Sequence, residues 1–440
     1  MGLTHLQPSA EQQAIIDAVA KGENIFITGV AGTGKSFVID QIRERYPVAV
    51  TATTGIAALN VGGSTIHTWA GLGDGSMDPA SIAGRIRNTT IPWIAPIRNN
   101  IVGCKILVID EVSMLSAKML NTIDFVFRNV RDIPLPFGGI QIILTGDFLQ
   151  LPPVTKDLED PESGEFCYKA KAWHDANIRV CQLTKVFRQQ NQFFADALGR
   201  IRMGEPLDSD CVMLMQREGV LWGRGSGEDV DPIRVFGTNA MADTLNYECL
   251  TKLNDCELTY MAEDVPKAEL SEKQKQMYSD KMNRDCLAPK ALLLKVDAQV
   301  MLLRNINVEA GLVNGSMGRV MDFDESGQPI VKFTNGRQVT IKKESWELKE
   351  GLNLPNQPPD VVYSRRQYPL RLAWGITIHK CQGMSLDRVY CDLSRIFAEG
   401  QAYVALSRAK TLEGLFLSGF NRSKIFANKS AVRFYKELNA

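Results

Sequence analysis

Gly29-Val30-Ala31-Gly32-Thr33-Gly34-Lys35-Ser36 is the stretch of this 440-residue chain that decides its fold. It follows a short apolar run at residues 24–28, which predicts a buried strand. It precedes a helix-like segment and matches the pattern G-x-x-x-x-G-K-[ST], a strand-turn-helix unit that binds phosphate groups. The sequence therefore predicts an α/β fold with a nucleotide site after this strand. A glycine-rich turn without a ligand is the alternative.

The residue types in this stretch suit the triphosphate of ATP. Glycines let backbone N–H groups turn inward around the phosphates, and the N-terminus of the following helix adds partial positive charge. We expect Lys35 to reach the β- and γ-phosphates and Ser36 to ligate Mg²⁺. The predicted nucleotide-binding residues of this turn are Gly29, Gly32, Thr33, Gly34, Lys35 and Ser36.

A carboxylate pair follows a second apolar run, at residues 105–109. Open α/β sheets place ligand chemistry at the carboxyl ends of their strands. We expect Asp110 to hold Mg²⁺, directly or through water, and Glu111 to orient and deprotonate the attacking water. Such a pair alone usually caps a helix. Together with the phosphate-binding turn it indicates ATP hydrolysis.

Short apolar runs without strict alternation recur along the chain, a pattern typical of strands buried on both faces of a parallel sheet. Ser9, with Gln12 three positions on, predicts the N-cap of a helix over residues 9–19. We interpret the runs as two α/β lobes. The first has strands at residues 24–28, 48–52, 105–109 and 140–145, and the second at 179–183, 233–237, 388–393 and 415–418.

The stretch over residues 298–368 has a different pattern. Its short apolar runs are broken by Asn-Gly and Ser-Gly pairs, which are hairpin signals, and residues 330–333 and 337–341 are predicted to pair. A small antiparallel β module inserted in the second lobe fits best. Residues 262–290, rich in Lys, Glu and Met, are interpreted as a helical or mobile insertion, and residues 73–93 as an insertion in the first lobe.

Composition sets further bounds. Fifty basic and fifty acidic residues balance, so any nucleic-acid path is a local groove rather than a global field. The nine cysteines form no Cys-x-x-Cys pair, which favours reduced thiols over zinc or disulfides. No apolar run is long enough for a membrane span, and no secretory signal is expected. These features predict a cytoplasmic protein of a bacterial or viral host cell, or a nuclear or mitochondrial one if the chain is a truncated eukaryotic core.

Taken in order, these segments resemble superfamily-one helicases, and most closely the Pif-type DNA helicases. The resemblance implies two RecA-like P-loop lobes with parallel sheets and an inserted SH3-like β domain. It places the first lobe at residues 1–178, with a wedge-like insertion at about 73–97, the second at 179–297 and 369–440, and the SH3-like domain at 298–368. Residues 115–132 match the family poorly. The matching segments are residues 9–12, 51–58, 62–67, 136–141, 146–154, 373–383 and 401–408.

The resemblance also implies roles for single residues. Gln12 would contact the adenine, Gln150 would sense the γ-phosphate, and Gly383 would belong to the nucleotide site. Arg188 and Arg408 would be arginine fingers, although each alone is more often a surface arginine. The catalytic set is then Lys35, Asp110, Glu111, Gln150, Arg188 and Arg408, with ATP and Mg²⁺ as cofactors.

Single-stranded DNA is gripped by phosphate contacts and by stacking on exposed rings. Trp69 is equally consistent with core packing, His67 with a structural hydrogen bond, and Trp374 with packing. Arginines at residues 365, 366 and 371 form a cluster, which in most proteins is only a solvated surface. The position of this cluster just before the segment at 373–383 favours contact with DNA phosphates. The predicted nucleic-acid residues are Thr54, Gly55, His67, Phe148, Asn239, His379, Lys380 and Tyr403.

The resemblance implies an ATP-dependent DNA helicase that moves 5′-to-3′ on single-stranded DNA in replication, recombination, repair or telomere maintenance. Its partners would be single-stranded DNA and single-strand/duplex junctions, with G-quadruplexes or RNA–DNA hybrids as further substrates, and no membrane. A monomer is expected, with a DNA-induced dimer as the alternative. Two other functions stay open: an ATPase that remodels protein–DNA complexes without unwinding, and a RecD-like recombination subunit.

Overall fold

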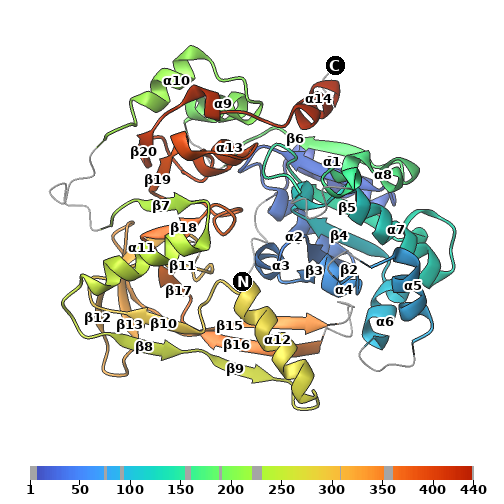
Figure 1. Cartoon of the computed structure of the whole chain (residues 1–440), viewed down its shortest axis with the longest axis horizontal. Coiled ribbons are helices and arrows are strands. Elements are labelled where there is room, and N and C mark those ends of the chain that lie inside the picture. Colours follow the sequence, from blue (N-terminus) through green and yellow to red (C-terminus); the bar gives the residue numbers. More distant parts are fainter. Residues whose placement is uncertain are drawn as a thin grey trace. The chain divides into compact units, whose positions relative to one another are not determined.

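The computed structural model describes residues 7–73, 77–89, 94–153, 160–187, 191–220, 230–307, 309–350 and 360–438 (Figure 1). The chain divides into two compact units. Unit 1 comprises Met1–Phe187, Pro266–Tyr278 and Glu347–Tyr363, and unit 2 comprises Arg188–Val265, Ser279–Trp346 and Ser364–Ala440. Across the described residues, none of the helices has the length and apolar character needed to cross a bilayer.

Unit 1 is built on a six-stranded sheet in the order β3-β2-β4-β5-β1-β6. Every neighbouring pair is parallel, and the central strands are buried, as the apolar runs predicted. The strands are β1 (Ile25–Gly29), β2 (Val48–Ala52), β3 (Ser64–Thr65), β4 (Ile106–Asp110), β5 (Gln141–Gly146) and β6 (Arg179–Leu183).

One strand assignment was wrong. β6 pairs in parallel with β1, with Ile25 opposite Arg179, so it belongs to the first sheet and not to the second lobe. The lobe boundary predicted at residue 178 is therefore also wrong, because unit 1 continues to Phe187. A short apolar run predicts a strand but carries no information about its neighbours.

Helices cover the sheet of unit 1 (Figure 1). α1 begins after the predicted cap Ser9 and packs with α2 against β1 through Ile16, Val19 and Ile39. The predicted insertion at 73–97 contains α5, which packs on α7, and the start of α6; residues 74–76 and 90–93 lie outside the described part. The helices are α1 (Ala10–Ala20), α2 (Lys35–Arg45), α3 (Gly55–Asn60), α4 (Ile66–Trp69), α5 (Pro79–Arg87), α6 (Ala95–Gly103), α7 (Ala117–Arg131) and α8 (Lys171–Asp175).

Unit 2 contains a four-stranded parallel sheet in the order β18-β7-β19-β20. Three of its strands were predicted; β18, only Gly375–Thr377, was missed. The other strands are β7 (Ile233–Phe236), β19 (Val389–Asp392) and β20 (Leu415–Gly419), and the helices are α9 (Gln192–Arg202), α10 (Asp208–Met215), α11 (Asn239–Thr251), α13 (Gln401–Leu406) and α14 (Lys429–Leu438).

An antiparallel five-stranded sheet in the order β14-β13-β12-β11-β17 forms the predicted β module. The hairpin around Asn335-Gly336 pairs Ile330 with Thr340, as predicted. The predicted limit at residue 368 is wrong, since β17 completes the sheet by pairing with β11. The strands are β11 (Gln299–Leu302), β12 (Met317–Phe323), β13 (Pro329–Phe333), β14 (Gln338–Thr340) and β17 (Leu370–Leu372).

Residues 262–290 include the predicted helix, α12 (Glu272–Asp285), but also a strand that the sequence did not suggest. β9 (Glu263–Pro266) joins β15 (Glu344–Glu350) and β16 (Asp360–Gln367) in a three-stranded sheet, and β8 (Leu258–Met261) pairs with β10 (Ala291–Leu294). Exposed and half-buried residues alternate in both β8 and β9. The pattern of β9 is hidden in the sequence because two of its four residues are acidic and one is proline.

Candidate functional site

The turn between β1 and α2 has the geometry of a phosphate cradle. Gly34 caps α2 with a left-handed backbone (φ 84°), a conformation that favours glycine. A Cβ on Gly34 would lie 2.8 Å from Nε2 of Gln12, and one on Gly29 would lie 2.5 Å from the Leu183 carbonyl oxygen. Both positions therefore require glycine, which agrees with the prediction from the motif.

Lys35 lies at the centre of this turn. Its Nζ donates to the carbonyl oxygens of Gly29 (2.8 Å) and Val30 (3.3 Å), and the Thr33 hydroxyl also donates to Val30 (3.0 Å). The ammonium group thus lies among the backbone groups that would surround phosphates. Ser36, the predicted Mg²⁺ ligand, is exposed at the first turn of α2.

Gln12 is buried and tied to the start of α1. Its Oε1 accepts from the Ser9 N–H (2.9 Å), and its own N–H donates to the Ser9 hydroxyl (3.4 Å). This capping box fixes the side chain beside Gly34. The amide predicted to contact adenine is therefore held at the end of the phosphate-binding turn.

Asp110 is the last residue of β4, the strand two places from β1 in the sheet, and Glu111 follows it. Burial raises the pKa of Asp110 to about 7, and the Glu111 charge acts in the same direction. Lys35 and the Thr145 hydroxyl oppose this rise. The structure therefore brings Lys35 together with Asp110, 75 residues away in the sequence, and with the adjacent Glu111.

These residues fit a magnesium ion. Mg²⁺ prefers carboxylate and hydroxyl oxygens, and Asp110 and Ser36 supply both at one edge of the sheet. A cation there would also relieve the repulsion between Asp110 and Glu111. The described residues contain no group of three or more His, Cys, Asp or Glu side chains that could hold a metal without ligands of another kind, so Ser36 and phosphate oxygens would have to complete the coordination.

Glu111 has a left-handed backbone (φ 55°, ψ 44°), which is uncommon for a residue with a side chain. Its N–H donates to Oδ1 of Asp110 (2.9 Å). Its carbonyl oxygen accepts from the Thr53 hydroxyl (2.7 Å), and the Thr53 N–H donates to the Asp110 carbonyl (3.1 Å). Sequence reasoning missed Thr53, because nothing local distinguishes it from its neighbours.

Gln150 follows β5, which lies between β4 and β1. Its N–H donates to the Asp147 carbonyl (3.0 Å), and Oδ1 of Asp147 accepts from the Leu149 N–H (3.1 Å). Both Asp147 and Gln150 are buried in this turn. The predicted γ-phosphate sensor thus lies after the strand that separates the Lys35 strand from the Asp110 strand.

The prediction that Phe148 contacts DNA is wrong. Its side chain is fully buried, and its ring packs 4.7 Å from Phe26 and 4.8 Å from Tyr168, between ring centroids. Phe166 and Trp173 complete this aromatic cluster. The sequence alone does not determine whether the Phe148 ring faces solvent or the core. Its burial in the core is favoured by the hydrophobic effect.

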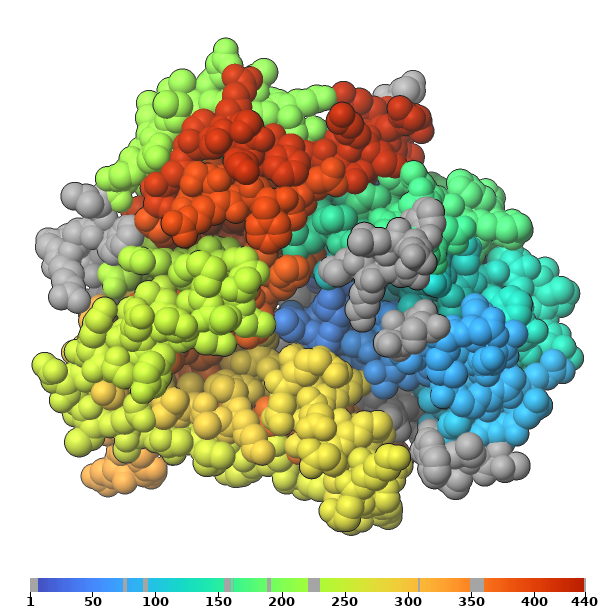
Figure 2. Space-filling model, in the orientation of Figure 1, coloured from blue at the N-terminus to red at the C-terminus, as the bar shows by residue number. Residues whose placement is uncertain are grey.

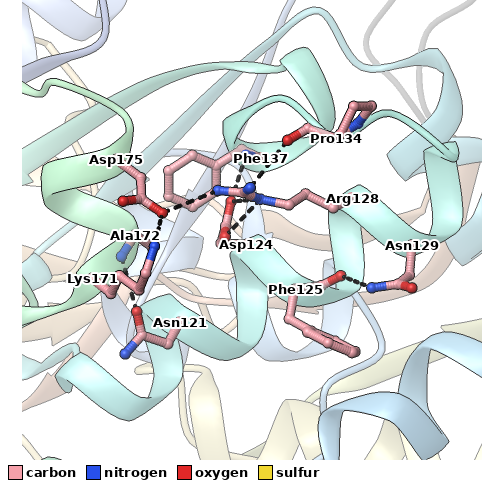
Figure 3. Close-up of polar contacts among 10 residues, drawn as sticks. All are labelled: Asn121, Asp124, Phe125, Arg128, Asn129, Pro134, Phe137, Lys171, Ala172 and Asp175. Atoms are coloured by element: carbon pink, nitrogen blue, oxygen red, sulfur yellow. Dashed lines mark hydrogen bonds and ion pairs between the residues drawn. The ribbon is translucent and has the colours of Figure 1, made fainter.

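The turn Pro136–Gly139, just before β5, is attached to α7 (Figure 3). Oδ1 of Asp124 accepts from the Phe137 N–H (2.6 Å) and from Nε of Arg128 (2.9 Å), and Arg128 also donates to the Pro134 carbonyl (3.0 Å). Phe137, Gly138 and Gly139 all have positive φ (51°, 61° and 76°). The attachment therefore fixes the start of β5, the strand that precedes Gln150.

Of the two predicted arginine fingers, the structure describes Arg408 only. Arg188 lies outside the described residues. Arg408 is buried, and its guanidinium donates to the carbonyls of Val404 (2.9 Å) and Met384 (3.3 Å) and to the Ser407 hydroxyl (2.8 Å). To act as a finger it would have to exchange these bonds.

The predicted DNA residues of unit 1 are accessible except Phe148. Thr54 caps α3, its hydroxyl accepting from the Ala57 N–H (3.2 Å), and Gly55 and His67 are half-buried. Trp69 is buried, with its ring centroid 6.0 Å from that of Phe127, so it belongs to the core.

In unit 2, Asn239 and His379 are exposed, and α11, which begins at Asn239, lies on the face seen in Figure 2. Gly383 is also exposed, in a left-handed turn (φ 78°). Tyr403 is 2% exposed, so the prediction that it contacts DNA is wrong; helix α13 is buried along its whole length. Trp374 packs against the core of the β module, as expected.

The arginine cluster at 365–371 separates into different environments. Arg365 is buried and bidentate with Asp264, at 2.7 Å for both bonds, so its role is structural. Arg371 has a buried Nε without a hydrogen-bond partner. Burial lowers the pKa of Arg371, and the pKa of Lys380 is lowered by burial and by the charge of Arg371. The Asp243 carboxylate opposes both shifts, so one anionic group already lies near these two cations.

Comparisons with known proteins agree with these motifs. Residues 7–205 match the family described as PIF1-like helicase, and residues 278–323 match the DNA helicase Pif1 2B domain. The ATP-dependent DNA helicase PIF1 of Danio rerio is 37% identical over 98% of this chain; the chain spans 64% of that relative's length.

Solved structures resemble the whole chain. The Pif1 helicase of Candida albicans is 34% identical, with a TM-score of 0.74 over 98% of this chain and 100% of that one. Pif1 of Bacteroides is 29% identical. Its complex with ADP-AlF4 has a TM-score of 0.83 over 99% of this chain and 97% of that one, and its complex with single-stranded DNA has 0.65 over 98% and 97%.

Proposed function

The chain belongs to the Pif1-like helicases, and on that premise we propose that it is an ATP-dependent DNA helicase that moves 5′-to-3′ on single-stranded DNA. The observation that carries the proposal is the meeting of Lys35, Asp110 and Glu111 at one edge of the six-stranded sheet. A nucleotide-binding protein without hydrolysis needs no carboxylate pair facing its phosphate-binding lysine.

In the proposed reaction the residues of unit 1 position ATP for attack by water. Lys35 and the backbone of the turn hold the phosphates, and Gln12 holds the base. Ser36 and Asp110 would hold Mg²⁺, whose charge would offset that of the phosphate oxygens. Glu111 orients the water and accepts its proton, which requires the ionised carboxylate. Gln150 senses the γ-phosphate, and Arg188 and Arg408 act as arginine fingers.

We place the DNA contacts on the accessible polar residues of both units. The complex of Bacteroides Pif1 with single-stranded DNA supports this substrate class, and so does a solved structure concerning unwinding at forked duplex DNA by two coordinating Pif1 helicases. Arg371 joins the predicted set as a phosphate contact, because its buried Nε has no hydrogen-bond partner and Lys380 places a second cation near it. The proposed contacts are Thr54, Gly55, His67, Asn239, Arg371, His379 and Lys380.

Tailed duplexes test the proposal. Strand separation is measured with a 5′ tail, a 3′ tail and a fork, with and without ATP, and with Lys35→Ala and Glu111→Gln as inactive controls. ATP-dependent separation of 5′-tailed and forked substrates is expected. Unwinding of 3′-tailed substrates alone would refute the direction. DNA-stimulated ATPase activity without strand separation would support the alternative, an ATPase that remodels protein–DNA complexes.

A further inference from the structure

Two segments with different proposed roles are joined at Thr53. It lies between the end of β2 and Thr54-Gly55, the proposed DNA-contacting start of α3, and it bonds to the backbone of both Asp110 and Glu111. We propose that Thr53 is a positioning residue that makes the aim of the Glu111 carboxylate depend on DNA bound at Thr54-Gly55. This rests on the proposed function, in which Glu111 activates water and DNA stimulates hydrolysis.

The backbone of Glu111 requires external support. A left-handed conformation is unfavourable for a residue with a Cβ and persists where the surroundings hold it. Because φ and ψ fix the direction of the Cα–Cβ bond, they also fix where the carboxylate starts. The Thr53 hydroxyl binds the Glu111 carbonyl oxygen at 2.7 Å, and the Thr53 N–H binds the preceding carbonyl at 3.1 Å. Thr53 thus restrains both peptide groups that flank this conformation.

Thr53 is also rigidly connected to the DNA-contacting segment. The next residue, Thr54, caps α3 through its hydroxyl, which accepts from Ala57 N–H (3.2 Å), and through its carbonyl, which accepts from Ala58 N–H (2.9 Å). One peptide unit, about 3.8 Å between Cα atoms, separates the cap from the residue that holds Glu111. A shift of the first turn of α3 on DNA binding would therefore move the support of Glu111.

The chain provides a matched control two residues away, in β2. The Thr51 hydroxyl donates to the Val108 carbonyl of β4 at 2.8 Å, two residues before the corresponding bond of Thr53. Thr51→Val and Thr53→Val each remove a bond from a threonine hydroxyl to a backbone carbonyl, the first between β2 and β4 and the second just beyond their ends, and both keep the side-chain shape. Only the second removes a contact with Glu111, so a general effect on the sheet would appear in both variants.

The test compares the full chain with Thr53→Val, Thr53→Ser, Thr53→Ala and Thr51→Val. The kcat and KM for ATP are measured with and without a deoxythymidine oligonucleotide, and oligonucleotide affinity is measured by fluorescence anisotropy at one salt concentration. We expect Thr53→Val to lower DNA-stimulated kcat roughly three- to tenfold, the range for loss of one neutral hydrogen bond, with unchanged KM and DNA affinity. Thr53→Ser should retain stimulation, and Thr51→Val should stay within about twofold of the unmodified chain.

Two results would overturn the proposal: equal behaviour of Thr51→Val and Thr53→Val, or a loss of DNA affinity that accounts for the loss of turnover. Thr53→Ala repeats the comparison if valine at residue 53 impairs folding. The underlying function fails in a different way. Full turnover of Glu111→Gln, or an unmodified chain whose ATPase activity ignores DNA, would reject the role of Glu111 or the motor itself, whatever Thr53 does.

Discussion

Replacement of Gly138 by alanine should destabilise unit 1 far more than the same replacement at Gly139. Both glycines have left-handed backbones, with φ of 61° and 76°, so each alanine pays for a conformation that costs about 1–2 kcal/mol. In both variants the lower conformational entropy of the unfolded chain offsets about 0.4–1 kcal/mol of this loss in unfolding free energy. The backbone terms are therefore matched between the two positions.

The difference lies in what the new methyl group meets. At Gly138 it would lie 2.7 Å from the Phe127 carbonyl oxygen and 2.9 Å from Cδ of Arg131, both on α7. At Gly139 its nearest neighbours, side-chain carbons of Ile133 and Leu135, are 3.9 Å away. Forcing a methyl group against backbone typically costs a further 1–3 kcal/mol. We expect Gly139→Ala to lose about 1 kcal/mol of unfolding free energy and Gly138→Ala about 2–4 kcal/mol.

Urea unfolding followed by tryptophan fluorescence measures the difference, because Trp69 and Trp173 report on the core of unit 1. The ATPase rate at low temperature shows whether the β5 turn keeps its geometry in the folded fraction. Equal unfolding midpoints for the two variants would refute the close approach of Gly138 to α7. A larger loss at Gly139 would refute the assignment of the two environments.

Three further predictions concern burial and charge. Phe148→Leu should lower the unfolding free energy by about 1 kcal/mol and leave oligonucleotide affinity unchanged in anisotropy titrations; lost affinity in a fully stable variant would restore a stacking role. Arg371→Gln should weaken oligonucleotide binding and reduce the salt slope by about one, whereas Arg366→Gln, which removes an exposed cation 3.5 Å from Glu263, should do neither. Hydrogen bonds from Arg200 hold the pKa of Asp210 below its ordinary value, so the pair stabilises the fold above about pH 4, and this contribution is lost as pH falls through the folded-state pKa. Asp210→Asn should therefore flatten the loss of stability on acidification, measured as unfolding midpoint against pH; an unchanged slope would contradict the pairing.

The parts of the site that the sequence predicts are those encoded by neighbouring residues. The phosphate-binding turn requires glycine at positions where a Cβ would collide, so its pattern is local and recognisable. Asp110 and Glu111 were placed correctly because strand ends in a parallel sheet share an edge. The capping box of Ser9 and Gln12 is likewise a matter of residues three apart.

Features that depend on distant packing could not be predicted in the same way. The rings of Phe148 and Tyr403 belong to residues next to motif residues in the sequence, but both rings are buried in the core. The position of β6 beside β1 depends on chain topology, which a short apolar run does not encode. Thr53 was missed because its importance comes from a hydrogen bond to a residue 58 positions away.

The bonds of Lys35 to the Gly29 and Val30 carbonyls have a consequence for nucleotide affinity. Because the lysine has these protein partners, phosphate oxygens would replace carbonyl oxygens on binding, and the number of hydrogen bonds on the ammonium group need not increase. The favourable free energy of ATP binding at Lys35 then comes mainly from the replacement of carbonyl dipoles by negatively charged phosphate oxygens. This electrostatic contribution is screened by salt. Removal of the lysine side chain also removes hydrogen bonds within the turn itself. Part of the defect of Lys35→Ala is then a loosened turn before any nucleotide arrives.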